Sequence, residues 1–92
     1  MTAAVPEPTR QFVSNLERLI AERGLTPAAV ADRADVHRSH LSLILAGKRT
    51  VQLDTMVKLA GALEVSPPRL LAGVEWVVDR RGGGEYRLAP GS

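Results

Sequence analysis

The stretch GLTPAAVADRADVHRSHLSLILAG, residues 24–47, decides the fold. Thr26 and Pro27 are typical of an N-cap and a first helical position, where the missing N–H and fixed φ of proline do no harm. Asp35 should end this helix, because a short polar side chain tolerates the left-handed turn conformation better than most residues. From Val36 the apolar positions resume at helical spacing. The stretch therefore predicts two short helices joined by a tight turn.

A pair of helices of this kind lets one helix cross the DNA backbone while the next enters the major groove. The neighbouring charges favour the same interpretation, since no acidic residue lies between Asp35 and Asp54. That run holds three cations and both histidines of the chain, which are Arg38, Lys48, Arg49, His37 and His40. Although the net charge is only +2, a local basic excess is what a phosphate-facing surface needs. An ordinary solvated face is the alternative.

Helical periodicity continues on both sides of this stretch. Thr9 is the expected N-cap of a preceding helix over residues 10–23. A further helix is expected over 53–63, and the Ser66-Pro67 cap signal predicts a fifth helix. The residues expected to face the core are Phe12, Val13, Leu16, Leu19, Ile20, Val30, Ala31, Ala34, Leu41, Ile44, Leu45, Leu53, Met56, Val57, Ala60, Leu63, Leu70 and Leu71.

After Gly73 the apolar pattern changes from a helical period to a period of two. Two such segments flank the glycine-rich turn Arg80-Arg81-Gly82-Gly83-Gly84, so residues 74–88 are expected to form a β-hairpin. Its apolar face should carry Val74, Trp76, Val78, Tyr86 and Leu88. A lone hairpin is marginal in water, so either a second chain or the helices of its own chain must cover this face. We expect a second chain, which makes the face a dimerisation element.

Length and composition predict one small domain with tails. The 92 residues are 45% hydrophobic and only 3% aromatic, which favours a helical core of aliphatic side chains. The expected organisation is a disordered tail over 1–8, a DNA-binding domain over 9–73, the hairpin over 74–88 and a tail over 89–92. The lack of cysteine excludes disulfides and thiolate chemistry. No segment has the roughly 18 consecutive apolar residues of a membrane span, so we expect a cytoplasmic protein without a membrane partner.

The stretch GLTPAAVADRADVHRSHLSLILAGKRTVQLDTMVKLAGALEVSPPRLL, residues 24–71, resembles the phage repressor and Cro-type (XRE-like) helix-turn-helix family. The resemblance rests on Ala31 at the helix crossing, Val36 after the turn, buried Leu41 and Ile44, Gly47-Lys48-Arg49 and Leu63-Glu64-Val65-Ser66. It implies an all-α, five-helix, lambda-repressor-like DNA-binding domain, here with a C-terminal β-hairpin. It also implies a sequence-specific transcriptional regulator. Because one recognition helix covers few base pairs, we expect a repressor that binds a palindromic operator as a homodimer.

The resemblance also assigns roles to residues at the DNA. The expected base-reading residues are His37 at the helix N-cap and Arg38, Ser39, Ser42 and Leu43 on the groove-facing side. Arg38 can donate two parallel hydrogen bonds to O6 and N7 of guanine. The expected phosphate contacts are Thr26, His40, Lys48 and Arg49, together with backbone N–H groups at the helix starts.

Three positions depart from the family pattern. Pro27 stands where a glutamine commonly binds phosphate, so that contact is lost or moves to Thr26. Asp35 replaces the turn glycine, and Leu43 replaces a polar residue, although it can touch a thymine methyl. These departures keep open a protein-interaction module that has lost DNA binding. The other alternative is an antitoxin-type autorepressor that holds a protein partner through the hairpin or the N-terminal tail.

Neither catalysis nor a metal or other cofactor is expected. His37 and His40 lie three residues apart at a helix start, but a metal site needs at least one further ligand that the sequence does not place. The scattered carboxylates and serines pair no nucleophile with an oriented base. The triple glycine lacks the helix and the Lys-Ser/Thr pair of a phosphate loop. The expected partners are double-stranded DNA and a second copy of the chain.

Overall fold

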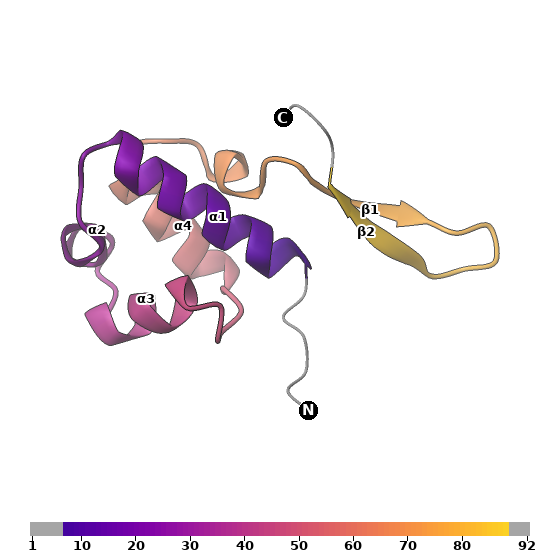
Figure 1. Ribbon diagram of the computed structural model, residues 1–92, viewed down its shortest axis with the longest axis horizontal. Helices are drawn as coiled ribbons and strands as arrows, with labels where there is room; N and C mark the ends of the chain where they lie inside the picture. The colour runs from indigo at the N-terminus through magenta and orange to yellow at the C-terminus, as the bar shows by residue number, and fades with distance from the viewer. Residues whose placement is uncertain (1–6, 89–92) are drawn as a thin grey trace.

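The structure is a computed structural model that describes residues 7–88. Its elements are the α-helices α1 (Glu7–Glu22), α2 (Pro27–Ala34), α3 (Arg38–Leu45) and α4 (Leu53–Ala62), the 3-10 helix η1 (Pro67–Leu71) and the strands β1 (Val74–Val78) and β2 (Gly84–Leu88). Figure 1 shows the helices gathered around one another, with the strand pair projecting away from them. We call residues 7–71 the helical body and residues 74–88 the arm. The predicted tails lie outside the described residues, apart from Glu7 and Pro8.

One apolar core holds the helical body together. Leu16 of α1, Ile44 of α3 and Leu59 of α4 are all completely buried. The core positions predicted in the first two helices are confirmed, namely Phe12, Val13, Leu16, Leu19, Ile20, Val30, Ala31 and Ala34. Burial of an aliphatic side chain of this size contributes about 1.5–3 kcal/mol. The core therefore fixes the relative positions of the helices that carry the site.

Asn15 is a buried polar residue of α1 that connects the helical body to the root of the arm. Its Nδ2 donates hydrogen bonds to the carbonyl oxygens of Leu70 and Ala72 at 3.0 and 3.1 Å. Its Oδ1 accepts from Nε2 of Gln11 at 3.0 Å. Buried amides are stable only when their donors and acceptors are satisfied, and both are satisfied here. The end of η1 is thereby held against α1.

Two predictions about the ends of the helical body are wrong. Helix α1 begins at Glu7, so Thr9 is not its N-cap but a buried residue of its first turn. Pro8 is compatible with this start because the first turn needs no proline N–H. The predicted fifth α-helix is the short 3-10 helix η1, so the described residues contain four α-helices rather than five. Strand β1 begins at Val74, too soon after Pro67 for an α-helix to develop.

The predicted inward face of α4 is partly wrong. Leu53 and Val57 lie one turn apart and are 69% and 50% exposed. Ala60 and Leu63 are buried as expected, and they are accompanied by Leu59. All of these positions fit a helical period, but the contacts with the other helices select a buried stripe to one side of Leu53 and Val57. None of the described helices is both long and apolar enough to cross a membrane.

The predicted hairpin is confirmed, but its turn lies one residue earlier than predicted, because Asp79 belongs to the turn and Gly84 begins β2. Strands β1 and β2 pair antiparallel, with Trp76 opposite Tyr86 and Val78 opposite Gly84. The rings of Trp76 and Tyr86 meet edge to face at a centroid distance of 5.0 Å. A Cβ atom on Gly84 would clash with the backbone carbonyl oxygen of Val77 and would lie 3.0 Å from the Trp76 ring, so glycine permits the close approach of both groups. Gly82 and Gly83 take the positive φ values of the turn.

Candidate nucleic-acid interface

The turn between α2 and α3 has the geometry that its residues predict. Thr26 Oγ1 accepts a hydrogen bond from the N–H of Ala29 at 3.1 Å, which caps α2. Asp35 adopts a left-handed conformation with φ of 56°. The N–H of Val36 then donates to the carbonyl of Ala31 at 2.9 Å. These contacts close the turn, and only three residues separate the end of α2 from the start of α3.

Helix α3 has a buried side and an open side. Leu41 and Ile44 are buried, and they anchor the helix to the core. Four of the five predicted base-reading residues are exposed, namely His37, Arg38, Ser39 and Ser42, while Leu43 is half-buried. His37 occupies the N-cap position, but its side chain makes no capping hydrogen bond. The imidazole of His37 is therefore not used to cap the helix.

Three of the predicted base-reading residues share one surface with three of the predicted phosphate contacts, whereas Arg38 and Ser42 line neither of the hollows on it. One shallow hollow is lined by His37, Ser39, His40, Leu43 and Arg49. A second is lined by His40, Lys48, Arg49, Thr50 and Gln52. His40 and Arg49 line both hollows, so the two are neighbours. Thr26, the remaining predicted phosphate contact, lies at the start of α2 and lines neither of them.

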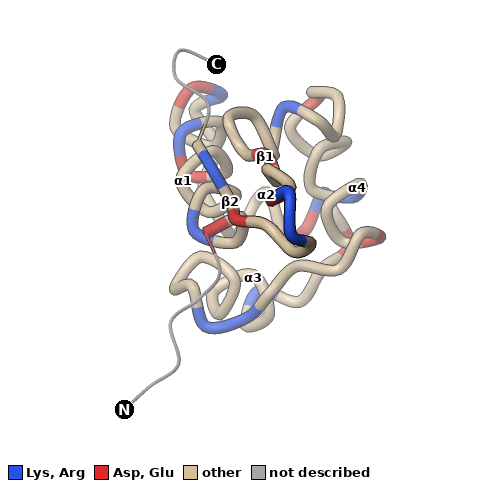
Figure 2. The backbone as a smooth tube through the Cα atoms, turned by 90° about the vertical axis from the view of Figure 1, so that its right-hand side faces the viewer, with Lys and Arg blue, Asp and Glu red and all other residues tan. Residues whose placement is uncertain are grey.

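The charge along the chain suits this surface to a polyanion. In Figure 2, blue segments of Lys and Arg lie along the tube next to α3. In the sequence, the acid-free run between Asp35 and Asp54 contains Arg38, Lys48 and Arg49. Lys48 and Arg49 are exposed, and two residues separate them from the end of α3. Positive side chains beside an open helix face are the usual means of contacting phosphates on either side of a groove.

Arg38 makes an ion pair that the sequence interpretation missed. Its Nη2 donates to Oδ2 of Asp32 at 2.7 Å, and its Nε donates to Oδ1 at 3.2 Å. Hydrogen bonding from Arg38 lowers the pKa of Asp32, and the same contact raises the pKa of Arg38. The side chains of Arg38 and Asp32 remain 66% and 59% exposed. The carboxylate of Asp32 on α2 is thus hydrogen-bonded to Arg38, the residue expected to read guanine.

In the sequence, the only sign of this ion pair is that Asp32 and Arg38 lie six residues apart, on opposite sides of the turn. Once the turn is tight, the last part of α2 lies beside the first residue of α3. An acid there can reach a base at the start of α3. A hollow lined by Asp32, Asp35, Val36, His37 and Arg38, among others, marks the same region.

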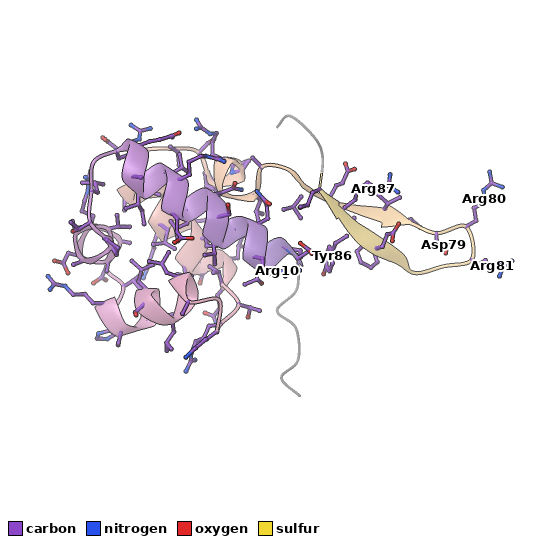
Figure 3. All side chains as sticks on the ribbon, viewed as in Figure 1. Arg10, Asp79, Arg80, Arg81, Tyr86 and Arg87 are labelled. Atoms are coloured by element: carbon purple, nitrogen blue, oxygen red, sulfur yellow. The ribbon has the colours of Figure 1, made fainter. Side chains whose placement is uncertain are left out.

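The predicted dimerisation residues lie together on one face of the arm. Val74, Trp76 and Val78 on β1 share this face with Tyr86 and Leu88 on β2. Val74 is half-buried at the root, whereas Trp76 is 52% exposed and Val78 71% exposed. Helix α1 contacts both strands, but the aromatic pair stays open to solvent. Figure 3 shows Arg80 and Arg81 extending from the tip, far from the helical body.

Residues 16–70 match the model of the Helix-turn-helix family HTH_3. The chain belongs to this helix-turn-helix family. The matched range runs from the middle of α1 into η1 and contains the whole of α2 and α3. The family is one of DNA-binding regulators rather than enzymes, so this helix-turn-helix protein is a DNA-binding protein of the transcriptional-regulator class. The arm lies outside the matched range.

Solved structures agree with this assignment. The restriction-modification controller protein C.AhdI from Aeromonas hydrophila is 31% identical, covers 67% of this chain and 94% of its own, and superposes with a TM-score of 0.65. An HTH_3 family transcriptional regulator from Vibrio cholerae is 29% identical over 71% of this chain and 36% of its own, with a TM-score of 0.67.

A third structure shows the same fold at lower identity. The clp gene regulator ClgR from Corynebacterium glutamicum is 23% identical over 76% of this chain and 90% of its own, with a TM-score of 0.67. No curated protein matches the chain significantly.

Proposed function

We propose that this helix-turn-helix protein is a sequence-specific repressor that binds a palindromic operator as a homodimer. The observation that carries the proposal is the open side of α3, where Arg38, Ser39 and Ser42 are exposed while Leu41 and Ile44 hold the opposite side in the core. A helix presented in this way can enter the major groove and offer donors to base edges. A protein that occupies an operator overlapping a promoter excludes the polymerase from it, which is repression by occupancy.

The proposed contacts divide into those that read bases and those that position the protein. Arg38 donates to guanine, and Ser39, Ser42, His37 and Leu43 face neighbouring base edges or thymine methyl groups. The phosphate contacts come from His40, Lys48, Arg49 and Thr26. The Thr26 oxygen already accepts from Ala29, but its O–H proton is available for a phosphate. Phosphate contacts fix the register without reading the sequence.

A second copy of the chain is the proposed cover for the apolar face of the arm. Trp76 and Tyr86 are each about half exposed, and aromatic residues are enriched in protein interfaces. Two identical faces can cover one another about a two-fold axis, which is also the symmetry of a palindromic operator. Two five-residue strands form a small interface, so the dimer should dissociate on dilution and be stabilised by the operator through mass action.

Matched pairs of substitutions on the two faces of the arm test the dimer. Trp76→Thr with Tyr86→Thr removes the aromatic pair, while Glu75→Thr with Arg87→Thr changes the opposing cross-strand pair on the other face. Sedimentation over a range of concentrations should show a monomer for the first variant and an unchanged monomer–dimer equilibrium for the second. An unchanged dimer in the first variant would overturn the assignment. Substituting Leu53 and Val57 by Ser would then test the exposed side of α4.

Selection of bound sequences from random DNA tests the function as a whole. The expected result is a palindrome with half-site centres about 34 Å apart, and affinity that falls steeply with salt. No enrichment, together with binding that is absent even at low salt, would instead indicate a protein-interaction module. Enrichment of a single asymmetric site would contradict the dimer while preserving DNA recognition.

A further inference from the structure

Asp32 lies on α2, and its carboxylate meets the side edge of the Arg38 guanidinium. We propose that Asp32 is a positioning residue for base reading, which holds the Arg38 guanidinium so that its remaining donor edge points at a guanine. The inference rests on the proposed function of Arg38. It adds a second residue, from the preceding helix, to the machinery that sets sequence preference.

The pattern of hydrogen bonds leaves the guanine-reading edge of Arg38 unoccupied by Asp32. A guanidinium has one N–H on Nε and two on each Nη. Asp32 takes the Nε proton and one proton of Nη2. The other Nη2 proton and both Nη1 protons remain on the end of the fork. That end matches the spacing of O6 and N7 in guanine, so carboxylate and base do not compete for one edge.

The ion pair also orders a side chain that is otherwise free to rotate. The Arg38 side chain is two-thirds exposed, and a long exposed side chain loses rotamer freedom when it binds. Asp32 removes part of that freedom before DNA arrives, and a donor that is already oriented binds with a smaller entropic loss. Asp32 itself belongs to a regular helix whose Val30, Ala31 and Ala34 are buried, so the carboxylate is presented by a fixed element.

Charge explains why an acidic residue is tolerated near DNA at this position. A lone carboxylate there would repel the phosphates, but its contact with Arg38 compensates that charge. An aspartate is ionised at neutral pH and able to accept both hydrogen bonds, and the same contact lowers the pKa of Asp32 further. The positive charge of Arg38 partly neutralises Asp32, while the free N–H groups at the end of its guanidinium donate to the base.

The experiment compares base preference in the full chain and in Asp32→Asn, which retains the size of the side chain but replaces one acceptor by a donor. Preference is measured as relative affinity for the selected operator and for operators changed at each symmetric pair of positions. We expect Asp32→Asn to lower the preference for guanine at one symmetric pair by about threefold to tenfold, a usual coupling between contacting residues. Preferences at the remaining positions should stay the same.

Asp54→Asn is the matched control, because it removes a carboxylate from an exposed position of α4 without touching Arg38. It should leave all preferences unchanged. In an Arg38→Ala background, Asp32→Asn should have no further effect on the guanine preference, since Asp32 acts through Arg38. Thermal unfolding of each variant verifies that the fold is retained.

Two results would overturn the proposal in different ways. If Asp32→Asn tightens binding to all sequences equally and leaves every preference intact, Asp32 is only a competing charge and the positioning role is wrong. If Arg38→Ala leaves base preference unchanged at every position, the role of Arg38 as a base reader is wrong, and the positioning role falls with it.

Discussion

The helical body buries Leu16, Ile44 and Leu59 completely, whereas the arm leaves Trp76 and Tyr86 about half exposed. In the body, aliphatic side chains from several helices enclose one another. In the arm, two short strands offer only one apolar face, and nothing among the described residues covers its aromatic pair. The helical body is therefore stabilised by its own apolar core. The arm has an exposed apolar face that a second molecule can cover.

The largest expected effect comes from the core of the helical body. Leu59→Ala should lower the free energy of unfolding by about 2–5 kcal/mol, because it leaves a cavity at a completely buried position. Leu53→Ala on the same helix should change it by less than about 0.5 kcal/mol, because Leu53 is largely exposed. Chemical denaturation measures both. Equal effects would contradict the buried stripe assigned to α4.

The next effect concerns the connection between the body and the arm. Asn15→Leu removes both hydrogen bonds to the carbonyls of Leu70 and Ala72. It should lower the free energy of unfolding by about 1–3 kcal/mol, the usual result of leaving buried polar groups without partners. Hydrogen exchange should also become faster in β1 and β2. If exchange in the arm is unaffected, Asn15 stabilises the body alone.

Two cations of the body should affect DNA binding in different ways. Arg38→Ala should reduce discrimination at one symmetric pair of operator positions by about 1–3 kcal/mol. Lys48→Ala should weaken binding to all sequences alike and reduce the salt slope by about one. Binding titrations at several salt concentrations distinguish the two. A uniform loss from Arg38→Ala would make that residue a phosphate contact.

The smallest effect is a change in the titration of Asp32. The Arg38 contact lowers the folded-state pKa of Asp32, so the ion pair stabilises the folded chain above the unfolded-state pKa. That contribution is lost as the pH falls through the lowered folded-state pKa. Both groups are exposed, so the gain in stability is small. In Arg38→Ala, carboxyl NMR should show the pKa of Asp32 rising toward its ordinary value, and an unchanged titration would contradict the ion pair.

The turn and its two helices were predictable because their signals are local. The Thr26 side chain caps the helix that follows it, and Asp35 adopts the left-handed conformation that ends it. Such contacts span at most a few residues, so the order of amino acids is enough to specify them. The alternating pattern of the arm was equally local, since its strands are joined directly by the turn.

The errors and omissions arose where distant or three-dimensional contacts decide. Both sides of α4 fit a helical period, and only packing against the other helices leaves Leu53 and Val57 exposed. The Ser66-Pro67 signal is the same for an α-helix and for the 3-10 helix that forms. Asn15 finds its acceptors 55 and 57 residues further along the chain. The contact between Asp32 and Arg38 depends on side-chain conformations that no periodicity records.

The hydrogen bonds of Asn15 have a further consequence for the operator. They fix the root of the arm to α1, and α1 packs on the same core as α3. In the proposed dimer, the separation of the two recognition helices is then set by a rigid path from α3 through the core and Asn15 into the arm. A rigid path accepts one spacing between half-sites and rejects operators that are a base pair longer or shorter. Loosening it at Asn15 would yield a protein that tolerates several spacings with the same half-site sequence.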